Sequence, residues 1–143
     1  MRFMVMVKEN DESEAGVLPD AQIFEEMNRF NEEMVKAGVM LAGEGLHPSS
    51  KGARIRFDGD TRTVIDGPFA ETKELIAGFW LIQVKSREEA IEWVKRAPFG
   101  GGVELEIRQV FETEDFGDAL SPEVRESETR LRAQVEAQQR QGQ

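Results

Sequence analysis

Three side chains in the sequence have the types and settings that suit proton transfer or ligand binding. Asp66 ends the apolar stretch "TVI" and opens the segment "DGPFAETKE". His47 is the only histidine, in "GEGLHP", and Glu44 lies three residues before it, between two glycines. Imidazole exchanges protons near neutral pH, and a positioned carboxylate serves as a general acid or base. We therefore take Asp66, His47 and Glu44 as the candidate catalytic residues.

Each candidate also has a structural interpretation. An aspartate before Gly-Pro accepts backbone hydrogen bonds two residues on and makes a turn. A histidine before proline lies in extended backbone, where it often only ends a strand. Glu44 would either orient His47 or bind a cationic ligand. Metal binding by all three is an alternative, but no spacing indicates an ion, and no metal site is predicted. Whether Asp66 makes a turn or lines a pocket stays open.

Composition excludes several classes of function. The 143 residues carry a formal net charge of −10, which disfavours binding to nucleic acids and to anionic membranes. The absence of cysteine removes disulfides and thiolate chemistry. "FGGG" and "GEGL" lack the fingerprints of nucleotide sites, and nothing indicates a flavin, nicotinamide or haem, so no cofactor is expected. The first apolar run is too short for a signal peptide or a membrane span, which predicts a cytoplasmic protein.

Hydrophobic periodicity predicts the elements that position these residues. Helices are expected at residues 20–37, with a stripe of Ile23, Met27, Phe30 and Met34, and at 86–97, opened by a capping box of Ser86 and Glu89. Strands are expected at residues 2–8, 39–46, 78–85 and 103–110, with a hairpin around Asp58-Gly59-Asp60. This order predicts an α+β, ferredoxin-like antiparallel sheet with an inserted hairpin and two helices on one face.

The predicted sheet has a second face that is too apolar to face water. "FMVMV" and "AGFWLI" are apolar at both alternating sets of positions. Two such faces packed together would form a twofold homodimer. Residues 1–116 form the predicted domain. Residues 117–143 begin well as a helix, with Ser121 as cap and Pro122 after it, but their apolar stripe is thin. A helical arm and a partly disordered tail are both consistent with that segment.

The longest motifs resemble those of a known family. "AGVMLAGEGLHPSSKGARIRF", "VIDGPFAETKELIAGFWLIQV" and "SREEAIEWVKRAP" are similar to the DGPF branch of the YCII-related proteins, over about residues 1–112. The resemblance implies a dimeric α/β-barrel, in a superfamily with muconolactone isomerases and antibiotic-biosynthesis-type monooxygenases. It also implies that Gly67, Pro68, Phe69, Glu71 and Lys73 accompany Asp66 as motif residues, which we expect to bind a ligand.

An active site is not carried over by the resemblance. Relatives in the YciI branch have a histidine on the first helix and an aspartate before the proline that follows the second. Here Glu26 or a neighbour and Ala97 stand at those positions. Two hypotheses follow. In one, the protein is a dimer that binds a small organic molecule between sheet and helix, with cofactor-free isomerase- or lyase-like chemistry. In the other, it is a non-catalytic partner of an extracytoplasmic-function sigma-factor system.

Overall fold

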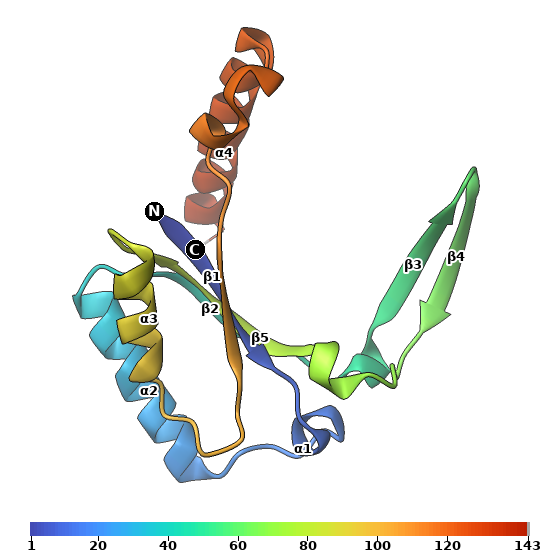
Figure 1. Ribbon diagram of the computed structural model, residues 1–143, viewed down its shortest axis with the longest axis vertical. Helices are drawn as coiled ribbons and strands as arrows, with labels where there is room; N and C mark the ends of the chain where they lie inside the picture. Colours follow the sequence, from blue (N-terminus) through green and yellow to red (C-terminus); the bar gives the residue numbers. More distant parts are fainter. Residues whose placement is uncertain (143) are drawn as a thin grey trace. The chain divides into compact units, whose positions relative to one another are not determined.

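A four-stranded antiparallel sheet with strand order β2-β5-β1-β6 is the centre of the chain (Figure 1). The computed structural model describes residues 1–142, and the chain divides into Met1–Val110 and a second unit that starts at Phe111. The sheet consists of β1 (Arg2–Lys8), β2 (Met40–Gly45), β5 (Ile76–Gln83) and β6 (Leu105–Gln109). Helices α2 (Ala21–Lys36) and α3 (Arg87–Lys95) cover one face, and the hairpin of β3 (Ala53–Asp58) and β4 (Thr61–Asp66) is inserted between β2 and β5. The predicted α+β, ferredoxin-like fold is confirmed.

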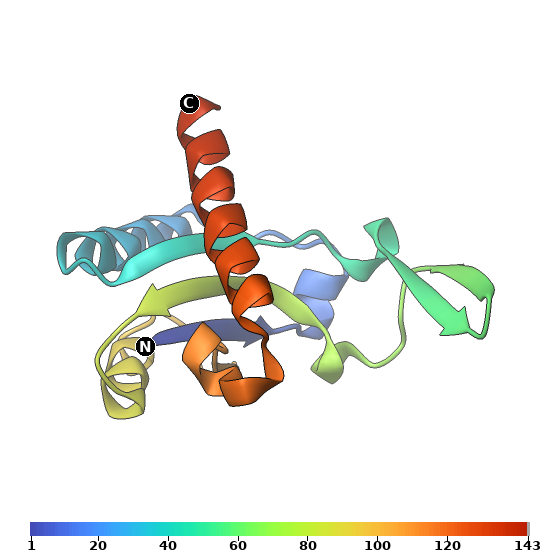
Figure 2. The ribbon, with the colours of Figure 1, turned by 90° about the horizontal axis from the view of Figure 1, so that it is seen from above.

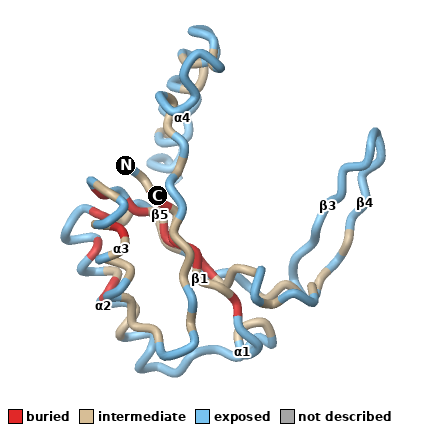
Figure 3. The backbone as a smooth tube through the Cα atoms, viewed as in Figure 1, coloured by how far each residue is buried: buried red, intermediate tan, exposed pale blue. Residues whose placement is uncertain are grey.

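The core lies between this sheet and the two helices. Alternate residues of β1 and β5 are buried (Figure 3). Successive side chains of a strand face opposite sides, and the buried set packs with residues of α2 and α3. The buried cluster consists of Phe3, Val5, Phe30, Met34, Val39, Trp80, Ile82, Val84 and Ala90. Of the stripe predicted on α2, Phe30 and Met34 are buried and Met27 is half-buried, but Ile23 is exposed.

The capping box predicted at the start of α3 forms with one difference, and α2 has a cap that was not predicted. The Asp20 side chain accepts a hydrogen bond from the Ile23 N–H at 3.0 Å, and Ser86 accepts one from the Glu89 N–H at 3.1 Å. The Glu89 carboxylate accepts the N–H of Lys85, not that of Ser86, so the reciprocal half of the expected capping box is shifted by one residue.

The first glycine of the "GEG" segment, Gly43, is required by the packing of a neighbouring side chain. A Cβ on Gly43 would lie 2.7 Å from a ring carbon of Trp80, which faces Gly43 across β2 and β5. The indole N–H of Trp80 donates to Asn31 Oδ1 on α2 at 2.9 Å. Gly43 therefore makes room for the large core side chain that ties β5 to α2.

Residues 1–142 also contain four short helical segments and one long helix. They are α1 (Asp11–Glu14), η1 (Ser49–Lys51), η2 (Thr72–Glu74), η3 (Thr113–Ala119) and α4 (Pro122–Gln141). The Ser121 side chain caps α4 by accepting the N–H of Val124 at 3.2 Å. None of the helices in residues 1–142 combines the length and apolarity needed to cross a membrane.

Candidate functional site

The DGPF loop is held against the segment that follows β2 by backbone contacts. The Gly67 N–H donates to the Gly52 carbonyl at 3.0 Å, and the Phe69 N–H donates to Ser49 Oγ at 2.9 Å. A Cβ on Gly67 would lie 1.7 Å from the Ser49 carbonyl oxygen, a distance at which no side chain fits. The glycine of the motif is therefore required by the close approach of two backbone segments.

The turn expected from Asp66 is not made by its side chain. The residue two positions on is Pro68, which has no N–H, and the N–H of Phe69 is used by Ser49. Asp66 ends β4, pairs with Ala53 of β3, and is exposed. The Gly67–Pro68 peptide bond is cis. The loop is thus shaped by its contacts with residues 49–52 and not by an aspartate-capped turn.

Two glutamates that sequence reasoning missed continue this network. The Ser49 hydroxyl donates a hydrogen bond to the Glu14 carboxylate, and the Ser49 N–H donates to the same carboxylate at 3.2 Å. The hydroxyl hydrogen bond is the main reason why the pKa of Glu14 is lowered. Burial, reinforced by the neighbouring Glu14, raises the pKa of Glu9, whose residue is 7% exposed. No local pattern links Glu14 to Ser49, which lies 35 residues further along the chain.

We expect Glu9→Gln to stabilise the protein at pH 8 and to lose that advantage in acid. An amide keeps a donor for Glu14 and removes the cost of burying a charge. Because the pKa of Glu9 is raised, the wild type loses stability as pH rises from the usual carboxyl range through the folded-state pKa. The melting temperature of the variant should exceed that of wild type by about 2–4 °C at pH 8, which corresponds to a difference of about 1 kcal/mol in the free energy of unfolding.

The control for this experiment is the pH dependence itself. The Ser49 hydrogen bonds, which are the main reason why the pKa of Glu14 is lowered, are present in both proteins, so their loss of effect as pH falls cancels in the difference. Thermal unfolding followed by circular dichroism from pH 3 to pH 8 should show the difference shrinking toward acid. A difference that is constant with pH would contradict the buried, titrating Glu9.

The structure does not gather the three catalytic candidates into one site. Glu44 lies in β2, His47 in the loop after it, and Asp66 at the end of β4, and all three are exposed. Within residues 1–142, no group of three or more His, Asp or Glu side chains is placed to hold a metal ion. Glu71 and Lys73 are also exposed, beside or within η2. The Phe69 ring is half-buried, with the guanidinium carbon of Arg54 at 3.9 Å from its centroid.

The sheet face opposite α2 and α3, which we call the second face, brings together an apolar floor and charged groups. The register places Glu44 opposite Phe79, Phe79 opposite Met6, and Met6 opposite Glu106. In the next row Ala42, Leu81, Met4 and Arg108 lie side by side in the same way. The second face is defined by these eight residues. Of its four large apolar side chains, Met6 is buried and the others are half-buried.

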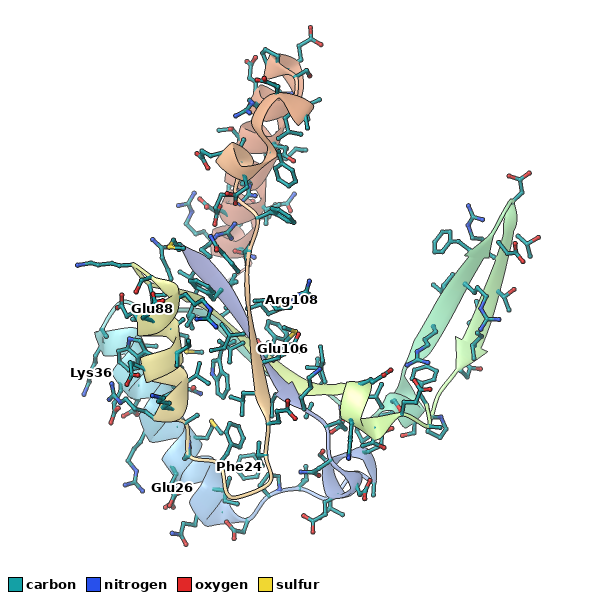
Figure 4. All side chains as sticks on the ribbon, in the orientation of Figure 1. Phe24, Glu26, Lys36, Glu88, Glu106 and Arg108 are labelled. Carbon is teal, nitrogen blue, oxygen red and sulfur yellow. The ribbon has the colours of Figure 1, made fainter. Side chains whose placement is uncertain are left out.

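The charges of the second face lie at its two edges. Glu44 belongs to the edge strand β2. Glu106 and Arg108 belong to the opposite edge strand, β6 (Figure 4). Three strand spacings separate the Cα atoms of Glu44 and Glu106, which is about 14 Å. Lys8 Nζ lies 3.5 Å from a carboxylate oxygen of Glu106. Polar groups on both sides of an apolar floor are the usual elements of a small-molecule site.

The space between the sheet and the helices is too small for the ligand expected there. The cavity lined by Phe30, Trp80 and Trp93 has a volume of about 10 Å³, which is the lower limit for holding one water molecule. Side chains of the core fill the rest of this layer. The layer between the sheet and the helices therefore has no room for an organic molecule.

The first 114 residues match the model of a known family. The model of the YCII-related domain matches residues 1–114. The chain belongs to the YCII-related family. A relative from Rhizobium meliloti (strain 1021), an uncharacterised protein, is 33% identical over 89 residues, which cover 60% of this chain and 72% of that protein.

One solved structure with a similar arrangement is an enzyme. It is 5-chloro-2-hydroxyhydroquinone dehydrochlorinase from Burkholderia phenoliruptrix AC1100, solved in complex with 2,5-dihydroxybenzoquinone. The TM-score is 0.41 at 13% sequence identity, and the match covers 80% of this chain and 98% of that one.

Glu26 of α2, where the resemblance to the YciI branch predicts a histidine, lines an open groove in this YCII-related chain. The groove has a volume of about 410 Å³ and is lined by Glu26, Arg29, Phe30, Glu33, Arg96 and Pro98. Arg96 is committed to an ion pair with Glu33 and to the ring of Trp93, whose centroid lies 4.3 Å from the guanidinium carbon. Glu26 and Ala97 do not restore the missing pair of proton-transfer groups.

Proposed function

We propose that this YCII-related protein, of the DGPF type, is a homodimer that binds a small organic molecule on the second face of its sheet. The observation that supports the proposal is the apolar floor of Met4, Met6, Phe79 and Leu81, which lies on the side of the sheet away from both covering helices. A contiguous apolar surface of this kind is typical of an association or ligand site. Twofold packing of two such faces would enclose it.

The ligand chemistry follows from the two edges of the floor. A flat, apolar molecule would lie on Phe79 and Leu81. Hydroxyl or amino groups at one end would donate to Glu44, and an anionic oxygen at the other end would accept from Arg108. A ring of about 6–10 Å with polar groups at opposite ends would span the distance between the edge strands.

The reaction that this arrangement supports is cofactor-free proton transfer. Glu44 would remove a proton from one atom of the bound molecule and return it to another, as in an isomerisation, or assist the loss of a leaving group, as in a lyase. Glu44 is the candidate catalytic residue that lies on this face. For Asp66, Gly67, Pro68, Phe69, Glu71 and Lys73 we propose a role in supporting the hairpin base, and for His47 a role in ending β2.

The proposal is tested by a thermal-shift screen with small aromatic and alicyclic hydroxy and keto acids. A ligand at a hundred times its dissociation constant adds about 2.7 kcal/mol, which raises the melting temperature by several degrees. A binding compound should raise the melting temperatures of wild type and Asp66→Asn alike. Its dissociation constant for Glu44→Gln should be at least tenfold higher. Each variant must first match the circular dichroism spectrum of wild type.

The reverse result would contradict the assignment. If Asp66→Asn or His47→Ala abolished the response and Glu44→Gln kept it, the site would lie at the DGPF loop. If no compound bound to any of the folded proteins, the small-molecule function would be refuted. The hypothesis of a protein partner would then be preferred.

A further inference from the structure

A short helix links the end of β1 to the DGPF loop. Helix α1 (Asp11–Glu14) lies near the base of the β3–β4 hairpin in two perpendicular views (Figure 1 and Figure 2). None of its 4 residues is buried, and its start is capped by Asn10, whose side chain accepts the Ser13 N–H at 2.8 Å. A single helical turn has almost no stability of its own in water. The position of α1 therefore depends on its polar contacts with the rest of the unit.

One of these contacts reaches the DGPF loop through a serine. The Glu14 carboxylate accepts two hydrogen bonds from Ser49, one from its N–H at 3.2 Å and one from its hydroxyl group. The same hydroxyl oxygen accepts the N–H of Phe69 at 2.9 Å. Donation to Glu14 fixes the rotation of the hydroxyl group and leaves its lone pairs for Phe69. A change at Glu14 is therefore transmitted to the DGPF loop.

A second glutamate continues this chain of hydrogen bonds on the other side of Glu14. Glu9 is 7% exposed, and its N–H donates to the carbonyl of Leu75, just before β5, at 2.9 Å. Its side chain is hydrogen-bonded to Ser13 and Glu14. Two carboxyl groups share a hydrogen bond only when one of them keeps its proton. Burial favours the neutral form of Glu9, and the hydrogen bonds from Ser49 favour the ionised form of Glu14.

We propose that α1 is a pH-sensitive latch, which holds the DGPF loop while Glu9 is neutral and releases it when Glu9 ionises. Ionisation sends the proton to solvent and leaves two adjacent negative charges, one of them buried. Glu9 is tied through its backbone to Leu75, so it stays in place. Since α1 has no buried residue, it moves away instead, and Glu14 loses its hydrogen bonds with Ser49. The latch depends neither on the proposed ligand nor on the proposed dimer.

The pH determines when the latch is closed. Since burial raises the pKa of Glu9, the stability that its neutral form provides is complete below the usual carboxyl range and is lost as pH rises through the raised value. The Ser49 hydroxyl group lowers the pKa of Glu14, whose contribution is present above the usual carboxyl range and is lost as pH falls through the lowered value. The latch is therefore closed between the two values and opens above the higher one.

The other charged groups near Glu9 belong to the segments that contact residues 8–14. Lys8 Nζ lies 3.5 Å from a carboxylate oxygen of Glu106, on β6. The remaining charged or titratable side chains of α1, η1, η2 and the loops beside them are exposed, and they include Asp11, Glu12, His47, Lys51, Lys73, Glu74 and Glu104. Water and salt screen such groups. His47 needs a control of its own, because imidazole exchanges protons near neutral pH.

Hydrogen exchange measured by NMR at pH 5 and pH 8 tests the latch at the amides of Gly67 and Phe69. Each rate is compared with the intrinsic exchange rate at the same pH, which removes the chemical effect of pH and gives a protection factor. In wild type, the protection factor of the Phe69 amide should fall at least about fivefold from pH 5 to pH 8. It should stay at least about tenfold below that of the best protected amides of β1, since the loop opens without unfolding the sheet. In Glu9→Gln, whose side chain does not ionise, the fall should be less than about twofold.

Three further variants serve as controls. Glu12→Gln makes the same chemical change at an exposed residue of the same helix, and His47→Ala removes the imidazole. Both should keep the fall seen in wild type. Ser49→Ala removes the hydroxyl group between Glu14 and Phe69, so the Phe69 amide should be poorly protected at both pH values.

Several outcomes would overturn the latch. One is equal protection of the wild-type Phe69 amide at both pH values. Another is a fall that persists in Glu9→Gln, or that Glu12→Gln or His47→Ala removes, because a different group would then be responsible. A Phe69 amide that exchanges only as slowly as the best protected amides of β1 would also overturn it, because the loop would then open only when the whole unit unfolds.

Discussion

Gly67→Ala will destabilise the first unit by about 2–4 kcal/mol, because the new methyl group has no space. A Cβ at this position would lie 1.7 Å from the carbonyl oxygen of Ser49, and 2.6 Å from its carbonyl carbon. The two backbone segments would have to separate. That movement would break the hydrogen bonds from Gly67 to Gly52 and from Phe69 to Ser49, each worth about 1 kcal/mol and more when a buried partner is left unsatisfied.

Urea denaturation of Gly67→Ala and of a matched variant measures this effect. Gly45→Ala makes the same chemical change in β2, where a Cβ would meet no atom within 4 Å. Its free energy of unfolding should stay within about 0.5 kcal/mol of wild type. Equal stability of the two variants would show that residues 49–52 do not pack on the DGPF loop as described.

Leu81→Glu will convert the dimer to monomers if two sheets pack through their second faces. Leu81 lies in the middle of the floor, opposite Met4 on one side and Ala42 on the other. In a twofold dimer the substitution buries two carboxylates, and each costs several kcal/mol without a partner. The dimer dissociation constant should rise at least a hundredfold, which corresponds to about 2.7 kcal/mol.

The control is a carboxylate on the helical side of the molecule. Val35 of α2 is 60% exposed, so Val35→Glu adds the same charge to the chain without burying it. Sedimentation velocity should show that Val35→Glu remains dimeric and Leu81→Glu does not, with both variants folded by circular dichroism. A Leu81→Glu dimer as tight as wild type would rule out the sheet-to-sheet interface.

The sequence was sufficient for much of the fold because the relevant signals are local. The apolar run of β1, the helical stripe on α2 and the cap at Ser86 each depend on residues that are close together in the sequence. The hairpin turn at Gly59, where φ is 56°, was predicted for the same reason. One position of the stripe differs from the prediction: Ile23 has the spacing of the buried residues but is exposed, because burial depends on tertiary packing.

The candidate site was predictable only in part. Glu44 was singled out from its setting between two glycines, yet one of these glycines serves the packing of Trp80. Its place in a row with Phe79, Met6 and Glu106 depends on the pairing of four strands, which no local pattern reveals. A shift of one residue in that register would have moved Glu44 to the helix-covered face.

By itself, the sequence determined the order of the six strands and the two longer helices of the first unit, because the period of apolar residues differs between strands and helices and is read over short windows. Only the tertiary structure decided how the DGPF motif is held. Its glycine is required because the backbone carbonyl of Ser49 leaves no room for a side chain. Ser49 in turn is hydrogen-bonded to Glu14, 35 residues earlier. Such contacts arise when distant backbone segments dock, and their partners are set by the arrangement of the whole unit and not by their neighbours in the chain.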